Sequence, residues 1–226
     1  MADLTTTLAP HRTPDLAALG LDLARPLLIV DVDEVLGLFM QGFGRFLETR
    51  GYEMRIDRYA LFQSIFRPGA TEHLDLAEGR ALFDDFFRFG CGDIEPAPGG
   101  ARALAELSRD AGVVILSNAP GQGRLARARW LGRQGLDYPL ILNTGPKGPL
   151  AAALARQTSG PCAFIDDLIP NLDSVAESAP AVMRFQMVAD PRLRLFAPSA
   201  PERHTRIDDW PQMKDAVAQA IARPRG

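Results

Sequence analysis

Four acidic residues of this chain follow apolar segments, at positions suited to binding a cation. Asp31 and Asp33 come at the end of "LLIVDVD", and Asp166 and Asp167 close "CAFIDD". Carboxylates that lie close together repel one another, and a divalent cation relieves that repulsion. An all-oxygen set of ligands favours Mg²⁺ over zinc. The acids therefore predict a magnesium site, with one aspartate left free to act as a nucleophile.

Three more polar residues follow other apolar segments. Ser117 and Asn118 end "VVILSN", and Lys147 follows "LILN" in the loop "TGPKG". A cation and a lysine together neutralise a dianionic phosphate, and a hydroxyl with backbone N–H groups can donate hydrogen bonds to its oxygens. We therefore expect Ser117, Asn118 and Lys147 to bind a phosphate group.

The apolar segments that carry these residues are nearly continuous, which is typical of strands buried on both faces. We expect strands at 27–32, 112–117, 139–143, 162–166 and 181–188. Helical patterns occur at 99–111, 123–134, 148–157, 171–178 and 210–222. This alternation predicts an α/β fold with a doubly wound, mainly parallel sheet. Because ligands bind beyond the carboxyl ends of such strands, the polar residues should meet at one edge of the sheet.

One interval departs from the alternation. Between about 38 and 96 no convincing strand pattern occurs, and helical patterns appear at 43–51, 57–66 and 77–89. We interpret residues 39–96 as a small helical cap domain inserted after the first strand. Residues 26–38 and 97–226 then form the α/β core, residues 1–25 a loose N-terminal leader, and 190–209 an irregular connection.

These segments resemble the four motifs of the haloacid-dehalogenase superfamily of phosphotransferases. The first motif, Asp-x-Asp-x-(Thr/Val) after an apolar strand, is "DVDEV" here. The second, a strand ending in Ser or Thr, is "VVILS", and the third is a lysine ahead of a helix, at Lys147. The fourth, a strand ending in two acids, is "AFIDD", with Asn171 four residues after its last acid. The motifs occur in the family's order between about residues 26 and 188.

The resemblance implies a role for each acid of the first motif. Asp31 would be the nucleophile that forms an aspartyl-phosphate, and also a metal ligand. Asp33 would be the general acid and then the general base, with its backbone carbonyl at the metal. The dehalogenases of the family lack this second acid, so Asp33 favours phosphoryl transfer.

The resemblance also implies roles for the remaining motif residues. Ser117 and Lys147 would hold the phosphoryl oxygens. Asp167 would bind the Mg²⁺ directly, and Asp166 would bind it directly or through water. The insert matches the family's first type of cap, which closes over a small substrate and excludes water.

The predicted function is that of a Mg²⁺-dependent phosphatase acting on a small phosphomonoester such as a nucleotide or a sugar phosphate. A phosphotransferase or mutase is one alternative, and a catalytically silent binding or regulatory protein is another. The segment "ARARWLGRQGLDYPLILNTGPKG" also resembles the deoxyribonucleotidase-like branch of the family. A competing motif, "GQGRLA" at 121–126, fits a dinucleotide-binding loop, but it follows the second apolar strand and not the first.

Composition excludes several other classes of protein. The 226 residues carry a formal net charge of −3, which argues against binding nucleic acid through bulk positive charge. We expect no membrane span, because no apolar run approaches about 18 residues. The N-terminus lacks the pattern of a secretory signal, so a cytoplasmic location is expected. Cys91 and Cys162 are expected to be buried fillers, and the sequence does not indicate an oligomeric state.

Four further features remain open between a functional and a structural interpretation. Glu34 is expected to face the cap or solvent, and His73 to be an ordinary surface residue. Asn171 either takes part in the fourth motif or caps the helix that follows it. The phenylalanines of the insert, Phe83, Phe86, Phe87 and Phe89, are expected to form its core, with a substrate-binding surface as the alternative.

Overall fold

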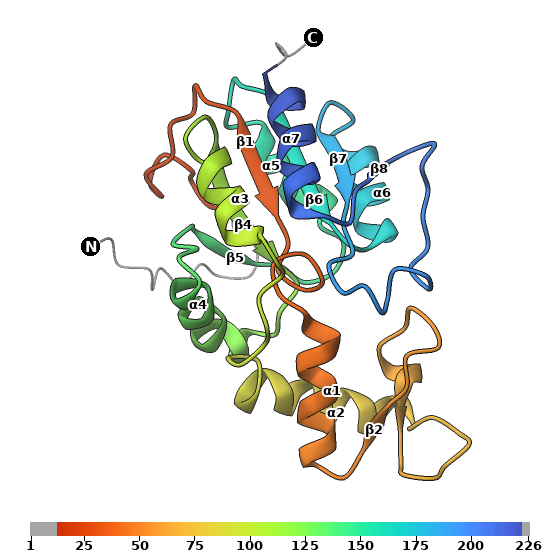
Figure 1. Ribbon diagram of the computed structural model, residues 1–226. Helices are drawn as coiled ribbons and strands as arrows, with labels where there is room; N and C mark the ends of the chain where they lie inside the picture. The colour runs from red at the N-terminus through yellow and green to blue at the C-terminus, as the bar shows by residue number, and fades with distance from the viewer. Residues whose placement is uncertain (1–12, 223–226) are drawn as a thin grey trace.

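A six-stranded parallel sheet forms the centre of the computed structural model, which describes residues 13–222 (Figure 1). The strand order is β5-β4-β1-β6-β7-β8, and every neighbouring pair is parallel. The strands are β1 (Leu27–Val30), β4 (Gly112–Ser117), β5 (Leu140–Leu142), β6 (Cys162–Asp166), β7 (Met183–Gln186) and β8 (Thr205–Arg206). Strand β1 therefore lies between the strands that carry the second and fourth motifs.

Helices cover both faces of this sheet. The central strand β1 presents apolar side chains to both faces, and each face must therefore be shielded from water. Leu28 and Val30 belong to the apolar cluster of one face, whereas Leu27 and Ile29 belong to the cluster of the other. The first face packs against α3 (Gly100–Leu107), α4 (Arg124–Arg133) and α7 (Trp210–Ile221). The second packs against α5 (Gly148–Ala155) and α6 (Ile169–Ser178). The predicted doubly wound α/β fold is confirmed.

The insert between β1 and α3 projects from the carboxyl-terminal edge of the sheet, in the lower half of Figure 1. It contains α1 (Phe39–Thr49), β2 (Glu53–Met54), the 3₁₀ turn η1 (Phe62–Ser64), β3 (Ile65–Phe66) and α2 (Leu76–Phe89). Strands β2 and β3 pair as an antiparallel hairpin. The expectation of an insert without strands, and of a helix over 57–66, is therefore wrong. Pairing with β2 overrides the helical pattern of that segment.

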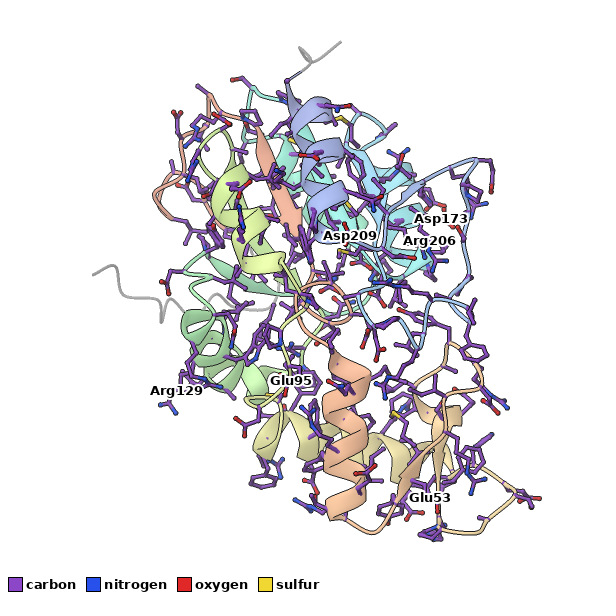
Figure 2. The ribbon with its side chains drawn as sticks, viewed as in Figure 1. Glu53, Glu95, Arg129, Asp173, Arg206 and Asp209 are labelled. Atoms are coloured by element: carbon purple, nitrogen blue, oxygen red, sulfur yellow. The ribbon has the colours of Figure 1, made fainter. Side chains whose placement is uncertain are left out.

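The insert joins the core through two chain segments that lie side by side. The N–H of Leu38 donates to the carbonyl oxygen of Glu95, and the N–H of Ala97 donates to that of Leu36, both at 2.8 Å. Figure 2 labels Glu95 near the start of α1. A Cβ on Gly37 would lie 2.5 Å from Ile94, so the close approach of these segments requires glycine there. The division into core and cap domains stays a prediction. The boundary between the two would fall at these paired segments.

Two other segments differ from expectation. Residues 13–25 are not loose, because Leu16 is fully buried and Gln157 of the core accepts a hydrogen bond from its backbone N–H. Residues 1–12 of the predicted leader lie outside the described part of the chain. The segment 190–209 contains the short edge strand β8, which its Pro- and Arg-rich sequence does not indicate.

The phenylalanines of the insert mostly form its core, as expected. Phe86 and Phe87 are 1% exposed and contact Phe39 and other rings. Phe89 is the exception, since it is 65% exposed. Phe87 also explains the sequence "GQGRLA", because a Cβ on Gly123 would lie 2.6 Å from its ring. The glycine allows the insert to pack against the 3₁₀ turn η2 (Gly121–Gly123).

Candidate active site

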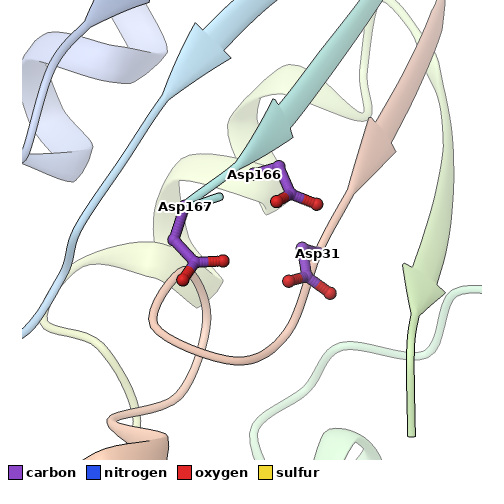
Figure 3. A group of neighbouring side chains, drawn as sticks. All are labelled: Asp31, Asp166 and Asp167. Carbon is purple, nitrogen blue, oxygen red and sulfur yellow. The ribbon is translucent and has the colours of Figure 1, made fainter. Parts of the chain in front are cut away.

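Three carboxylates meet at the carboxyl-terminal edge of the sheet, where β1 and β6 end (Figure 3). Asp31, Asp166 and Asp167 each place an oxygen within 4.8 Å of the others, and all three residues are buried. The register of β1 against β6 brings them together, since Val30 pairs with Ile165 and the Asp31 N–H donates to the Ile165 carbonyl. The expected convergence of the first and fourth motifs is thereby observed.

Lys147 lies against two of these acids. Its Nζ is 2.7 Å from Asp31 Oδ1 and 2.7 Å from Asp166 Oδ2, and the side chain is 1% exposed. Although burial by itself lowers the pKa of Lys147, the adjacent Asp166 and Asp31 raise it overall, so the group stays a cation. The one lysine balances only part of the acidic charge around it.

The loop that carries Lys147 is held by neighbouring elements. The amide of Asn118 donates to the carbonyl oxygen of Gly145 at 2.9 Å. Helix α5 begins directly after the lysine at Gly148, where an added Cβ would lie 2.0 Å from the carbonyl oxygen of Ser174 on α6. The glycine thus permits α5 and α6 to approach closely enough to place the lysine at the acids.

Asp166 is held by three donors. Besides Lys147, the amide of Asn171 donates to its Oδ1 at 3.0 Å and the backbone N–H of Leu168 donates to the same oxygen at 2.9 Å. Asn171 lies within α6, whose N-cap is Leu168, so the interpretation of Asn171 as the capping residue is wrong. Asn171 instead orients a carboxylate of the site.

Asp33 points to a different partner. Its carboxylate accepts hydrogen bonds from both terminal nitrogens of Arg127, at 2.7 and 3.1 Å, and the arginine side chain is fully buried. The side chain of Asp33 is not among the clustered carboxylates, and its predicted contact with a metal is through the backbone carbonyl. Arg127 was not predicted from the sequence. Nothing in "GRLARARWLGRQ" distinguishes a buried arginine from the exposed arginines of the same helix.

Ser117 ends β4 beside β1 and is fully buried. Its Oγ has no hydrogen-bond partner among the described residues. A buried hydroxyl without a partner is unfavourable by roughly 1–3 kcal/mol unless a ligand supplies one. This supports its predicted contact with a phosphoryl oxygen.

A cavity of about 220 Å³ lies between the core and the insert, and Asp31 and Asp167 of the cluster line it. Tyr59 of the insert lines it, and its hydroxyl donates a hydrogen bond to Asp167. Asn118 and Lys147 line the same cavity, as do Phe39 and Phe83 from the insert. Tyr59 was not predicted to belong to the site, because its segment was interpreted as one of the helices of the insert and carries no recognisable motif.

Glu34 is buried in the loop after β1, whereas the sequence left open a position facing solvent. Its φ is 57°, in the left-handed region, and it alone has a positive φ among the described residues other than glycine. One oxygen, Oε1, accepts a hydrogen bond from the Met40 N–H at 2.7 Å. The other, Oε2, is buried without a partner, and the residue lines the cavity. Desolvation raises the pKa of Glu34 to about 8, although the bond from Met40 opposes this shift.

The acidic cluster suits a hard divalent cation. Burial is the main cause that raises the pKa of Asp31, and Lys147 opposes it. Burial and then the charges of Asp166 and Asp31 raise the pKa of Asp167. Both shifts mean that the charged forms of these buried, closely spaced carboxylates are unfavourable. A bound cation would offset this repulsion. Carboxylate oxygens are the donors that Mg²⁺ prefers, so Asp31, Asp166 and Asp167 fit it.

The remaining expectations concern residues away from the cluster. His73 is exposed on the insert, as expected. Cys91 and Cys162 are both buried, also as expected. Within residues 13–222, no helix combines the length and the apolar character that crossing a membrane requires.

Comparison with known proteins identifies similar folds. No protein-family model and no curated protein matches the sequence. A conserved haloacid dehalogenase-like protein of Agrobacterium tumefaciens is 20% identical, with a TM-score of 0.59 over 87% of this chain and 99% of its own. YfnB of Bacillus subtilis, a HAD-hydrolase solved with magnesium, is 14% identical, with a TM-score of 0.60 over 85% and 98%. CbbY of Rhodobacter sphaeroides, solved with xylulose-1,5-bisphosphate, is 14% identical, with a TM-score of 0.53 over 82% and 95%.

Proposed function

Since the chain has the haloacid-dehalogenase fold, we propose that it is a Mg²⁺-dependent phosphatase that hydrolyses a small phosphomonoester through an aspartyl-phosphate. The observation that carries this proposal is the meeting of Asp31, Asp166 and Asp167 with Lys147 at the end of β1. The structures of similar fold that contain magnesium or a sugar bisphosphate support a phosphorylated small molecule as ligand.

In this proposal Asp31 is the nucleophile. Its carboxylate oxygen forms a bond to phosphorus while the bond from phosphorus to the ester oxygen breaks, and Asp33 gives a proton to the departing oxygen. Asp33 then takes a proton from water, whose oxygen bonds to phosphorus as the bond to Asp31 breaks. Inorganic phosphate leaves, and both aspartates return to their starting states.

The other residues bind and orient the phosphate. Lys147 and the unpartnered Ser117 hydroxyl are suited to its oxygens, and Asn118 holds the loop that carries the lysine. Bound Mg²⁺, held by Asp31, Asp166 and Asp167, would lower the negative charge that opposes attack on phosphorus. Arg127 positions the carboxylate of Asp33 through its two hydrogen bonds.

Phosphate release from a panel of nucleotides, sugar phosphates and small alkyl phosphates tests the proposal, with and without Mg²⁺. Asp31→Asn should retain the fold and lose at least about 10³-fold in kcat, since it lacks the nucleophile. Asp215→Asn on the exposed surface of α7 is the matched control and should keep wild-type rates. Wild-type turnover by Asp31→Asn would refute the assignment. Interconversion of isomers without phosphate release would indicate a mutase, and binding without turnover a silent protein.

A further inference from the structure

Apolar side chains form most of the cavity wall outside the acids. They come from the insert and from the loops that follow β6 and β7. The aromatic part of this wall is held in place, because Phe39 packs against Phe83, with 6.1 Å between ring centroids, and also against Phe86 and Phe87. The apolar residues that line the cavity include Phe39, Met40, Leu61, Phe83, Leu168 and Leu193.

Part of this wall keeps apolar surface in contact with solvent. Leu168 lines the cavity and is 41% exposed. Covering such a side chain with a hydrocarbon group is favourable, because apolar surface then leaves water on both sides of the contact. The cavity volume of about 220 Å³ limits that group to a compact one.

Three polar side chains that line the cavity already have partners within the protein. The Tyr59 hydroxyl donates to Asp167, and the amide of Asn171 donates to Asp166. The amide nitrogen of Asn118 donates to a backbone carbonyl, and its oxygen accepts a hydrogen bond from another asparagine. These side chains orient the acids and the loop after β5, and they leave few hydrogen bonds for the hydroxyls of a ligand.

Glu34 is likewise engaged by the protein. The Met40 N–H donates to its Oε1 at 2.7 Å, and the backbone N–H of Asp190 also contacts the carboxyl group. Burial raises the pKa of Glu34 to about 8, so the group is mostly neutral at pH 7. One neutral group cannot match the several hydroxyls of a sugar or polyol, which would therefore be buried without partners.

We propose that the site selects phosphomonoesters whose organic part is a compact hydrocarbon, and that it disfavours those of sugars and polyols. This inference rests on the proposed phosphatase function and specifies its substrate class. The organic group replaces water against the apolar wall, while the phosphate lies toward Lys147. Phe39, Leu61 and Phe83 of the insert are then specificity residues.

Pairs of esters that share a skeleton and differ in their hydroxyls test the proposal. Propyl phosphate is compared with glycerol 1-phosphate, and cyclohexylmethyl phosphate with glucose 6-phosphate. We expect kcat/KM for the hydrocarbon ester of each pair to exceed that of the hydroxylated ester by at least about tenfold, since hydroxyls buried without partners are unfavourable. The hydroxyls make the departing oxygen the better leaving group, so intrinsic reactivity would give the opposite order. Equal kcat/KM within either pair, or faster hydrolysis of the hydroxylated ester, would overturn the inference.

Leu61→Gln should weaken the preference. A glutamine amide on the wall can both donate to and accept from a hydroxyl of the substrate. We expect the ratio of kcat/KM for propyl phosphate to that for glycerol 1-phosphate to fall by on the order of tenfold. Leu125→Gln, the same change at a residue of α4 that is 59% exposed, should leave the ratio unchanged. An unchanged ratio in Leu61→Gln would refute the apolar wall as the source of selectivity.

Leu168→Gln replaces this variant if Leu61→Gln fails to fold by circular dichroism, because the Leu168 side chain is partly exposed. The same fall in the ratio is expected, and a constant ratio would refute the inference. Calorimetric binding of the four esters to Asp31→Asn with Mg²⁺ separates the two proposals. Selective binding of the hydrocarbon esters without wild-type hydrolysis would refute only the phosphatase, and hydrolysis without selectivity would refute only the substrate class.

Discussion

Arg127 and Asp33 form a bidentate ion pair in which the cation is fully buried and the carboxylate side chain is 25% exposed. The guanidinium also lies over the ring of Phe87, 5.2 Å from its centroid. Arg127 of α4 therefore contacts both a ring of the insert and the proposed general acid. The orientation of Asp33 depends on this contact, because a planar guanidinium fixes both carboxylate oxygens.

Replacing the arginine by lysine should separate charge from geometry. Arg127→Lys keeps a cation but cannot hold both oxygens of Asp33, so we expect kcat to fall by on the order of tenfold with a smaller change in KM. Steady-state kinetics of phosphate release measure this. Arg129→Lys, on the same helix but exposed (Figure 2), is the control. Full kcat in Arg127→Lys would mean that Asp33 needs no such positioning.

Gly148→Ala should destabilise the fold and disturb Lys147. The added Cβ would lie 2.0 Å from the Ser174 carbonyl oxygen, so α5 and α6 must move apart, at a cost of roughly 1–3 kcal/mol or more. Urea denaturation measures the free energy of unfolding, and phosphate release the accompanying loss of activity. Gly121→Ala is the matched control, because nothing lies within 4 Å of its added Cβ. Equal stability of the two variants would contradict the packing constraint.

Without Mg²⁺, the stability of the protein should fall as the pH rises. The folded pKa of Glu34 is about 8 against an ordinary value of 4.5, so the folded state binds the proton more tightly than the unfolded state. Its contribution is fully present below about pH 4.5 and is lost as the pH rises to about 8. Thermal unfolding across this range, in the presence of a chelator, should show a shallower decline for Glu34→Gln. An equal decline in both proteins would show that Glu34 does not titrate as described.

Tyr59→Phe should alter the affinity for Mg²⁺. The Tyr59 hydroxyl donates to Asp167, one of the carboxylates suited to the cation, so its removal frees an oxygen lone pair. We expect Mg²⁺ to bind the substrate-free variant a few-fold more tightly, as measured by calorimetry. Tyr52→Phe removes a hydroxyl that donates to Glu78 within the insert and should change nothing. Weaker binding in Tyr59→Phe would instead make the hydroxyl a support of the site.

The sequence predicts the core well because its strands are buried on both faces. β4 and β6 coincide with their predicted bounds, since continuous apolar runs bounded by turn residues leave little choice. β8 was missed because it has only two residues, neither of them buried, at the edge of the sheet. The helix expected over 57–66 fails because a hairpin contact, which is not local in sequence, outweighs local helical preference.

The candidate site divides in the same way. Asp31, Asp166 and Asp167 could be predicted to meet, because each stands at the carboxyl end of a neighbouring strand. The roles of Tyr59 and the burial of Glu34 could not be predicted, since each depends on how the insert lies against the core. The pairing of Arg127 with Asp33 could not be predicted either, since it depends on how α4 packs beside the loop after β1. The residue pattern within one segment does not indicate which distant segment it will contact in the folded chain.

The paired segments at Leu36–Leu38 and Glu95–Ala97 determine how the insert can move. The two segments are hydrogen-bonded to each other, so a rotation of the insert about them would keep these bonds, whereas a slide along them would break the bonds. The hairpin that carries Glu53, which Figure 2 shows far from Glu95, would then move farther than Gly37. Access to the cavity would then depend on the angle between insert and core, which is set at these paired segments and not by the reacting groups.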